Sequence, residues 1–277
     1  MEEIINDLNE QQRQAVECTE GPLLVLAGAG SGKTRVITRR IAYLIEQKLA
    51  KPWEILALTF TNKAAAEMRT RVAQLVGTVQ GMWVSTFHAA AVRIIRENAA
   101  LLGLTNSFVI YDDVDQMTLV RNIMKDLNLD SSRFKPRAIL SAISRAKNEM
   151  IEEDLYAEEA ADFYTRTVAR VYKSYQERLR SNNALDFDDL LLYVVKLFRE
   201  HPDVLVHYQQ RFRYILVDEY QDTNRVQYEI IFMLAGAHRN LCVVGDDDQS
   251  IYQFRGADIR NILEFERDWP DATVIKL

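Results

Sequence analysis

Cysteine is scarce in this sequence, and we find neither a secretion signal nor a membrane-spanning segment. The only cysteines, Cys18 and Cys242, are too few for a four-cysteine zinc site and are typical of reduced thiols inside a cell. Residues 1–8 carry three acids where a signal peptide needs positive charge, and no uncharged apolar run approaches the ~18 residues of a membrane span. We therefore expect a soluble, cytoplasmic protein that does not contact a membrane.

An excess of positive charge is also lacking. Lysine and arginine number 34 against 40 acidic residues, which gives a formal net charge of −6. No global positive field draws such a protein to nucleic acid, so any DNA binding must be local. Hydrophobic residues make up 48% of the 277 residues, enough to bury a core and to exclude disordered and fibrous classes. The length suggests about two domains.

Six apolar segments of strand-like composition alternate with amphipathic helical patterns. They span residues 22–27, 55–60, 82–86, 214–217, 241–245 and 273–277. This alternation is typical of a parallel sheet in an α/β fold. Within each segment polar and apolar residues do not alternate, as expected when helices cover both faces of the sheet. We predict an α/β fold with a central parallel sheet.

A helical and highly charged stretch interrupts this pattern between residues 111 and 185, and we interpret it as an inserted helical subdomain. The sheet domain would then consist of residues 1–110 and 186–277. Bases gather in the insertion at Arg133, Lys135, Arg137, Arg145 and Lys147, and residues 149–162 hold seven acids and no base. The bases form either a solvated helix face or an edge that contacts a nucleic acid backbone.

A glycine-rich loop follows the first apolar segment and precedes a helical pattern that runs to Ile45. Glycines let consecutive N–H groups turn toward an anion, and the following helix adds the positive end of its dipole. In a phosphate-binding loop of this type Lys33 reaches the β- and γ-phosphates and the Thr34 hydroxyl binds Mg²⁺. Ala27 stands where the motif usually has its first glycine. The nucleotide-binding residues predicted here are Gly28, Ala29, Gly30, Ser31, Gly32, Lys33 and Thr34.

Polar candidate site residues follow two further apolar segments: carboxylates after the first and a glutamine shortly after the second. Asp218 comes directly after residues 214–217, at the carboxyl edge of the sheet, where it can hold Mg²⁺ beside Thr34. The adjacent Glu219 suits the base that activates or orients an attacking water, which favours hydrolysis over transfer to a second substrate. Gln249, shortly after residues 241–245, both donates and accepts, so it can sense a terminal phosphate or hold the water. The predicted catalytic residues are Lys33, Asp218, Glu219 and Gln249.

Seven short motifs occur in order over essentially the whole chain. They are LNEQQ at 8–12, AGAGSGKTR at 27–35, TFTNKAA at 59–65, STFH at 85–88, LDFDDL at 185–190, VDEYQD at 217–222 and VGDDDQSIYQFRGA at 244–257. Together they resemble superfamily 1 DNA helicases of the UvrD/Rep/PcrA type. The resemblance implies a RecA-like P-loop NTPase motor domain with ATP and Mg²⁺ as cofactors. It also implies that Gln12 reads adenine through its amide and that Arg35 lies close to the nucleotide.

The resemblance further assigns a path for single-stranded DNA. Its residues are Phe60, Thr61, Asn62, Lys63, Thr86, His88, Phe187, Tyr252, Phe254 and Arg255. A base stacked on an aromatic ring contributes ~1–3 kcal/mol whatever its identity, which lets an acidic protein hold DNA. Phe254 stands where relatives often carry tryptophan, a larger stacking surface. The basic and neutral polar members are expected to contact phosphates.

Helicases of this family have a second motor domain that supplies an arginine finger, and this chain stops at Leu277, before that domain would begin. We expect the N-terminal motor half of an ATP-dependent 3′–5′ helicase or translocase, a monomer that binds single-stranded DNA or a duplex junction. Hydrolysis and unwinding would need the missing domain. Expected partners are DNA-repair or transcription proteins, with roles in DNA repair and replication. Two alternatives stay open: a non-catalytic docking module derived from such a helicase, and a P-loop nucleotide kinase.

Overall fold

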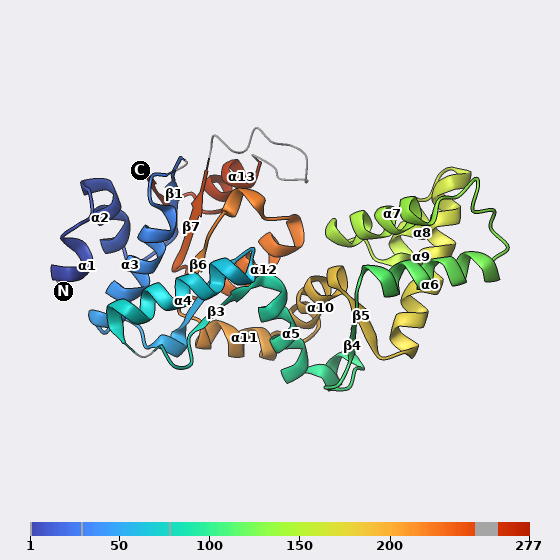
Figure 1. The fold of residues 1–277 in the computed structure, drawn as a ribbon, viewed down its shortest axis with the longest axis horizontal. Coiled ribbons are helices and arrows are strands. Elements are labelled where there is room, and N and C mark those ends of the chain that lie inside the picture. The colour runs from blue at the N-terminus through green and yellow to red at the C-terminus, as the bar shows by residue number, and fades with distance from the viewer. Residues whose placement is uncertain (1, 29, 78, 247–259) are drawn as a thin grey trace. The chain divides into compact units, whose positions relative to one another are not determined.

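The computed structural model describes residues 2–28, 30–77, 79–246 and 260–277 (Figure 1). The predicted site residues that lie outside the described residues are Ala29, Gln249, Tyr252, Phe254 and Arg255. No helix within the described ranges is long and apolar enough to cross a membrane. The chain forms two compact units, which are described separately below.

The first unit, made of residues up to Ala90 and of Phe198–Leu277, is built on a parallel sheet. Among the described residues six strands follow the order β3-β2-β6-β7-β1-β8 (Figure 1). They are β1 (Leu23–Leu26), β2 (Ile55–Thr59), β3 (Trp83–Thr86), β6 (Tyr214–Val217), β7 (Leu241–Gly245) and β8 (Thr273–Lys276). All neighbouring strands pair in parallel. The six predicted strand segments and the α/β class are confirmed.

Helices cover both faces of this sheet. They are α1 (Glu2–Ile5), α2 (Glu10–Glu17), α3 (Lys33–Glu46), α4 (Asn62–Val76), α11 (Pro202–Arg211), α12 (Arg225–Ala235) and α13 (Arg260–Asp268), with the short 3-10 helices η1 (Pro52–Glu54) and η3 (Tyr220–Asp222). The helices α2, α3 and α4 share one core with Leu23 and Val25 of β1. Leu24 is equally buried and points to the opposite face, because successive strand side chains alternate. On that face Trp83 of β3 contacts the ring of Tyr208 in α11, with centroids 6.3 Å apart.

The strands of the sheet end together at one edge, and this edge carries most of the predicted site. In the pairing of β1 with β7, Leu26 is aligned with Gly245. The Ala27 N–H donates to the Gly245 carbonyl at 2.9 Å, and the Asp218 N–H donates to the Leu58 carbonyl at 3.0 Å. The segments that follow β2, β6, β7 and β1 therefore emerge side by side at the carboxyl edge.

Side-chain caps mark where several helices begin. Reciprocal capping boxes start α2 at Asn9 and α12 at Asn224 in the first unit, and α6 at Asp112 and α9 at Asp162 in the second. In each case the cap side chain accepts a backbone N–H that the first helical turn leaves unpaired. These helix starts are therefore fixed by local sequence.

The second unit, Ala91–Leu197, is mainly helical. Its elements are the 3-10 helix η2 (Ala99–Leu102), the strands β4 (Val109–Tyr111) and β5 (Ala184–Asp186), and the helices α6 (Asp113–Asp126), α7 (Pro136–Asn148), α8 (Glu153–Glu159) and α9 (Phe163–Ser181). The helices α5 (Phe87–Glu97) and α10 (Phe187–Glu200) cross the boundaries between the units. The two strands pair in parallel, and a core that includes Ile123, Ile143 and Tyr172 joins α6, α7 and α9. This unit contains the segment 111–185 that we interpret as an insertion.

One member of the basic segment contradicts the expectation that its bases are solvated or contact nucleic acid. Arg133, Lys135 and Arg145 are exposed, but Lys147 is 1% exposed. Lys147 follows Ile143 by four residues and so lies on the buried side of α7. Carboxylates in the interior compensate its charge, which is why a lysine can occupy this position.

Candidate functional site

The glycine-rich loop connects β1 to α3 in a conformation that its glycines make possible. Gly30 and Gly32 have φ angles of 78° and 97°, in the left-handed region that favours glycine. A Cβ atom on Gly32 would lie 2.8 Å from the amide nitrogen of Gln12, so a larger residue does not fit without displacing that side chain. The Ser31 hydroxyl donates to the Gly28 carbonyl at 2.7 Å. Because α3 starts directly after Gly32, its N-terminal end faces the loop.

Gln12, the residue predicted to read adenine, lies against this loop. Its Nε2 donates to the Ser31 carbonyl at 2.8 Å, and its Oε1 accepts the Asn9 N–H at 3.2 Å. The second contact belongs to the capping box of α2, so the helix start orients the side chain. Gln12 is 7% exposed. The structure thus brings this predicted residue and the loop together.

The ammonium group of Lys33 lies between two carboxylates that come from different strand ends. Its Nζ is 3.0 Å from Oδ2 of Asp246, which follows β7, and 3.2 Å from Oε2 of Glu219, which follows β6. Burial lowers the pKa of Lys33, but the hydrogen bonds and charges of Asp246 and Glu219 outweigh it and hold the pKa above its ordinary value. Lys33 therefore carries a full positive charge at the carboxyl edge.

A buried glutamine links the same two carboxylate residues. Gln221 donates through Nε2 to Oε2 of Glu219 at 2.7 Å, and its Oε1 accepts the Asp246 backbone N–H at 3.0 Å. Gln221 is 2% exposed, and the absence of a side chain at Gly245 leaves room for its Oε1. With the two contacts of Lys33, these bonds close a ring. The sequence alone indicates no role for Gln221 or Asp246, because only the adjacency of β6 and β7 reveals the contact.

Asp218 directly follows β6 and is 3% exposed. Burial, with a smaller contribution from the charge of Glu219, raises the pKa of Asp218 to about 6, although Lys33 opposes the shift. A carboxylate that water solvates poorly gains from a nearby cation, so Asp218 suits a metal ligand. Among the described residues no cluster of three or more acidic, histidine or cysteine side chains could hold a metal alone. One carboxylate with the Thr34 hydroxyl fits Mg²⁺, which usually takes its other ligands from phosphates and water.

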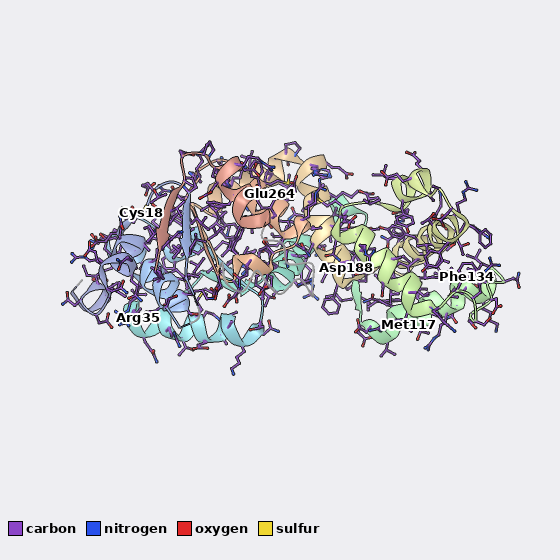
Figure 2. The ribbon with its side chains drawn as sticks, turned by 90° about the horizontal axis from the view of Figure 1, so that it is seen from above. Cys18, Arg35, Met117, Phe134, Asp188 and Glu264 are labelled. Atoms are coloured by element: carbon purple, nitrogen blue, oxygen red, sulfur yellow. The ribbon has the colours of Figure 1, made fainter. Side chains whose placement is uncertain are left out.

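Arg35, labelled in Figure 2, is on the first turn of α3, and its guanidinium binds Asp7. It donates to the Asp7 carbonyl at 2.9 Å and also to the carboxylate. Arg39 binds the same carboxylate at 3.0 Å. The two arginines therefore join α3 to the segment before α2.

The DNA-binding residues predicted in the first unit gather at the ends of β2 and β3. These strands are neighbours, with Thr59 aligned with Thr86. The hydroxyl of Thr61 accepts the N–H of residue 64 at 3.1 Å and that of Thr86 accepts the N–H of residue 89 at 3.2 Å. Each threonine hydroxyl thus accepts a backbone N–H in the first turn of a helix, α4 or α5. Two helix N-termini at one sheet edge form an environment that favours phosphate.

The side chains around these helix starts differ in exposure. Phe60 is half-buried, with its ring 5.6 Å from that of the buried Phe87. Asn62 and Lys63 are exposed, and His88 is half-buried. Phe187 belongs to the second unit, where it begins α10 and is 47% exposed.

Comparison with known proteins gives matches over the whole chain. Residues 8–270 match the family model described as UvrD/REP helicase N-terminal domain. Proteins named ATP-dependent DNA helicase PcrA from Staphylococcus epidermidis and Bacillus subtilis are 52% identical to it, and one from Staphylococcus aureus is 51% identical. The matches cover 99% to 100% of this chain and 37% to 38% of those proteins, so the chain spans less than two-fifths of their length. With the family model matching almost all of it, this chain belongs to the UvrD/REP helicase N-terminal domain family.

Proposed function

We propose that this chain is the N-terminal motor half of an ATP-dependent 3′–5′ DNA helicase that binds ATP with Mg²⁺ and single-stranded DNA. The observation that carries the proposal is the convergence of Lys33, Glu219 and Asp246 at one sheet edge. Three strand ends thereby surround one phosphate-binding loop, an arrangement suited to a nucleoside triphosphate. The names of the relatives support the helicase activity. The polarity and a cytoplasmic location follow from the resemblance to this family.

The nucleotide would be held by the loop and by the start of α3. The N–H groups of residues 28–34 donate to phosphate oxygens, and Lys33 exchanges its two carboxylate partners for the β- and γ-phosphates. Thr34 and Asp218 would hold Mg²⁺, which would supply positive charge to neutralise the phosphates. Gln12, already beside the loop, would read adenine. Arg35 would lie near the nucleotide once its guanidinium leaves Asp7.

Glu219 would accept the proton of the attacking water. Without nucleotide its carboxylate is engaged by Lys33 and Gln221. When Lys33 turns to the phosphates, the Glu219 carboxylate is released from that ion pair and becomes available to the water, while the Gln221 bond that orients it is kept. Gln249 is proposed to sense the terminal phosphate or to hold the water.

Single-stranded DNA would follow the ends of β2 and β3 in the first unit. Phe60 stacks on a base and the α4 and α5 N-termini receive phosphates. Phosphate contacts are also proposed for Thr61, Asn62, Lys63, Thr86, His88 and Arg255, and stacking for Phe187, Tyr252 and Phe254. The proposed partners also include a duplex junction and DNA-repair or transcription proteins, and the chain is proposed to be a monomer. Residues 111–185 are proposed to be an insertion into the motor domain. Unwinding would require a second motor domain with its arginine finger.

Two titrations test this function. A fluorescent ATP analogue and a labelled oligo(dT) should each bind the chain saturably, the nucleotide in a Mg²⁺-dependent manner and more tightly than a GTP analogue. Nucleotide binding without DNA binding would indicate a nucleotide kinase instead. Binding of neither would indicate a docking module. Fusion to the second motor domain of a PcrA relative should then add DNA-stimulated ATP hydrolysis and strand separation.

A further inference from the structure

A charged network lies in the interior of the second unit, outside the nucleotide site. Lys147 of α7 is 2.7 Å from Oδ2 of Asp186 and 2.8 Å from Oδ1 of Asp189, and all three side chains are almost fully buried. The Tyr175 hydroxyl donates to Asp186 at 2.9 Å, and Gln176 donates to Asp189 at 3.2 Å. The lysine ammonium also lies 5.0 Å from the centroid of the Tyr175 ring. Groups from α7 and α9 thus converge on the junction of β5 and α10.

The residues on both sides of Phe187 are fixed by this network. The backbone N–H of Asp189 donates to Asp186 at 2.8 Å, and that of Asp186 donates back to Asp189 at 3.2 Å, which caps the start of α10. Asp188, labelled in Figure 2, accepts a bond from the Asn148 amide at 3.0 Å. Phe187 stands between these anchored residues and is 47% exposed. The hydrogen bonds of the junction therefore fix the backbone on either side of a large aromatic ring that is exposed at the surface.

The energetics argue that the network specifies geometry rather than stability. A buried ion pair is often no better than apolar residues of the same size, because each charge loses its hydration. Here the cost is higher, since one lysine faces two buried carboxyls. Burial raises the pKa of Asp189 to about 7, whereas Lys147 outweighs the effect of burial at Asp186 and holds its pKa below the ordinary value. An apolar core could not supply the directional contacts that a charged pair makes.

We propose that Lys147 is a positioning residue, which anchors the β5–α10 junction so that Phe187 is held ready to stack on a base of single-stranded DNA. The inference rests on the proposed function, because it assumes that Phe187 contacts DNA. Lys147 is too deeply buried to reach DNA itself. It acts through the backbone on either side of the ring.

Oligo(dT) binding to the 277-residue chain tests this with single and double variants. Phe187→Ala should weaken binding by roughly 5- to 150-fold, the range for loss of one stacked base. Lys147→Met should weaken it by part or all of the same factor, and Lys147→Met/Phe187→Ala should bind no more weakly than Phe187→Ala. Nucleotide affinity, which depends on the first unit, should stay unchanged. Additive losses in the double variant would overturn the inference.

Salt dependence separates positioning from direct contact. Each phosphate contact on a single strand contributes about 0.7 to the slope of log affinity against log salt concentration. Lys147→Met should leave the slope unchanged, whereas Lys63→Met, at an exposed lysine, should reduce it by about 0.7. An equal reduction with Lys147→Met would contradict a role through Phe187. Lys173→Met is the matched control, because Lys173 is exposed in the same unit and pairs with Asp154 away from the network.

A milder pair of variants covers the case in which Lys147→Met does not fold. Tyr175→Phe keeps the ring and removes only the bond to Asp186, and Asn148→Ala removes the bond to Asp188. Each should weaken oligo(dT) binding, and neither should add to the loss caused by Phe187→Ala. If both variants bind oligo(dT) as tightly as the wild type, the inference about Lys147 is overturned and the proposed function is unaffected. If Phe187→Ala binds oligo(dT) as tightly as the wild type, Phe187 does not contact DNA. That result contradicts this part of the proposed function and also the inference.

Discussion

Replacing Lys33 with alanine should do more than remove one contact to a phosphate. A hydrogen bond from a charged group contributes about 1.5–3 kcal/mol. The ammonium also compensates Asp246 and Glu219, at 3.0 and 3.2 Å, and without it both carboxylates face an incoming polyanion. A unit charge at ~5 Å in a medium of effective dielectric ~20 costs about 3 kcal/mol. We therefore expect Lys33→Ala to weaken binding of an ATP analogue by roughly 10³- to 10⁴-fold.

A second substitution separates the two contributions. The side chain of Asp246 is 0% exposed and that of Glu219 is 36% exposed, so water screens Glu219 more and most of the repulsion should come from Asp246. Asparagine preserves the shape of Asp246 and removes its charge. Lys33→Ala/Asp246→Asn should therefore bind the analogue at least about tenfold more tightly than Lys33→Ala. Asp246→Asn alone should bind no more weakly than the wild type, because the phosphates then compete with one carboxylate fewer for Lys33.

Fluorescence anisotropy of the labelled ATP analogue at fixed Mg²⁺ and salt gives these affinities, and circular dichroism confirms that each variant is folded. An unchanged affinity for Lys33→Ala would refute the assignment of the loop. A double variant that binds no better than Lys33→Ala would refute the repulsion from Asp246.

Three further predictions concern DNA binding and stability. Phe60→Ala should weaken oligo(dT) binding by roughly 5- to 150-fold in an anisotropy titration. Phe232→Ala, at an exposed ring on α12, should leave binding unchanged. Equal effects of the two substitutions would show that Phe60 is not part of the DNA path. Arg40→Met should lower the free energy of unfolding in urea by about 3 kcal/mol, because the buried guanidinium donates to three backbone carbonyls at and just after the end of α2. Arg39→Met, whose side chain pairs with an exposed carboxylate, should cost less than half as much, and a similar loss from both would contradict this reasoning. Burial and a neighbouring carboxylate raise the pKa of Asp189 to about 7, above its unfolded value of about 3.9, so its contribution to stability is lost as pH rises through the folded pKa. Between about pH 4 and pH 7 the wild type should therefore lose unfolding free energy relative to Asp189→Asn, and parallel pH curves would count against the buried network as described.

The fold was largely predictable because its signals are local. Each of the six strands is a short, largely apolar segment, and the predicted phosphate-binding loop is recognised by its glycines followed by Lys33. Helix starts such as Asn9 carry their caps in the sequence. The strands β4 and β5 escaped prediction, because each has three residues and they pair across more than seventy intervening positions.

Contacts between distant segments were beyond sequence reasoning at the candidate site. That Gln221 bridges Glu219 to Asp246 depends on β6 lying next to β7, and the order of strands in a sheet is not written in any one motif. Lys147 looked like one base in a basic run, since charge counts do not show which side of a helix faces the interior. Its partner Asp186 lies 39 residues away.

The close approach of Gln12 to Gly32 makes two recognition tasks inseparable. The amide nitrogen would lie 2.8 Å from any Cβ at position 32, so the backbone that we propose binds the phosphates also contacts the side chain that we propose reads adenine. A larger residue at position 32 would displace the Gln12 side chain proposed to select the base, and it would strain the loop proposed to bind the phosphates. Selectivity for the purine and grip on the triphosphate should therefore fail together, and altered base preference is better sought at Gln12 than at its glycine neighbour.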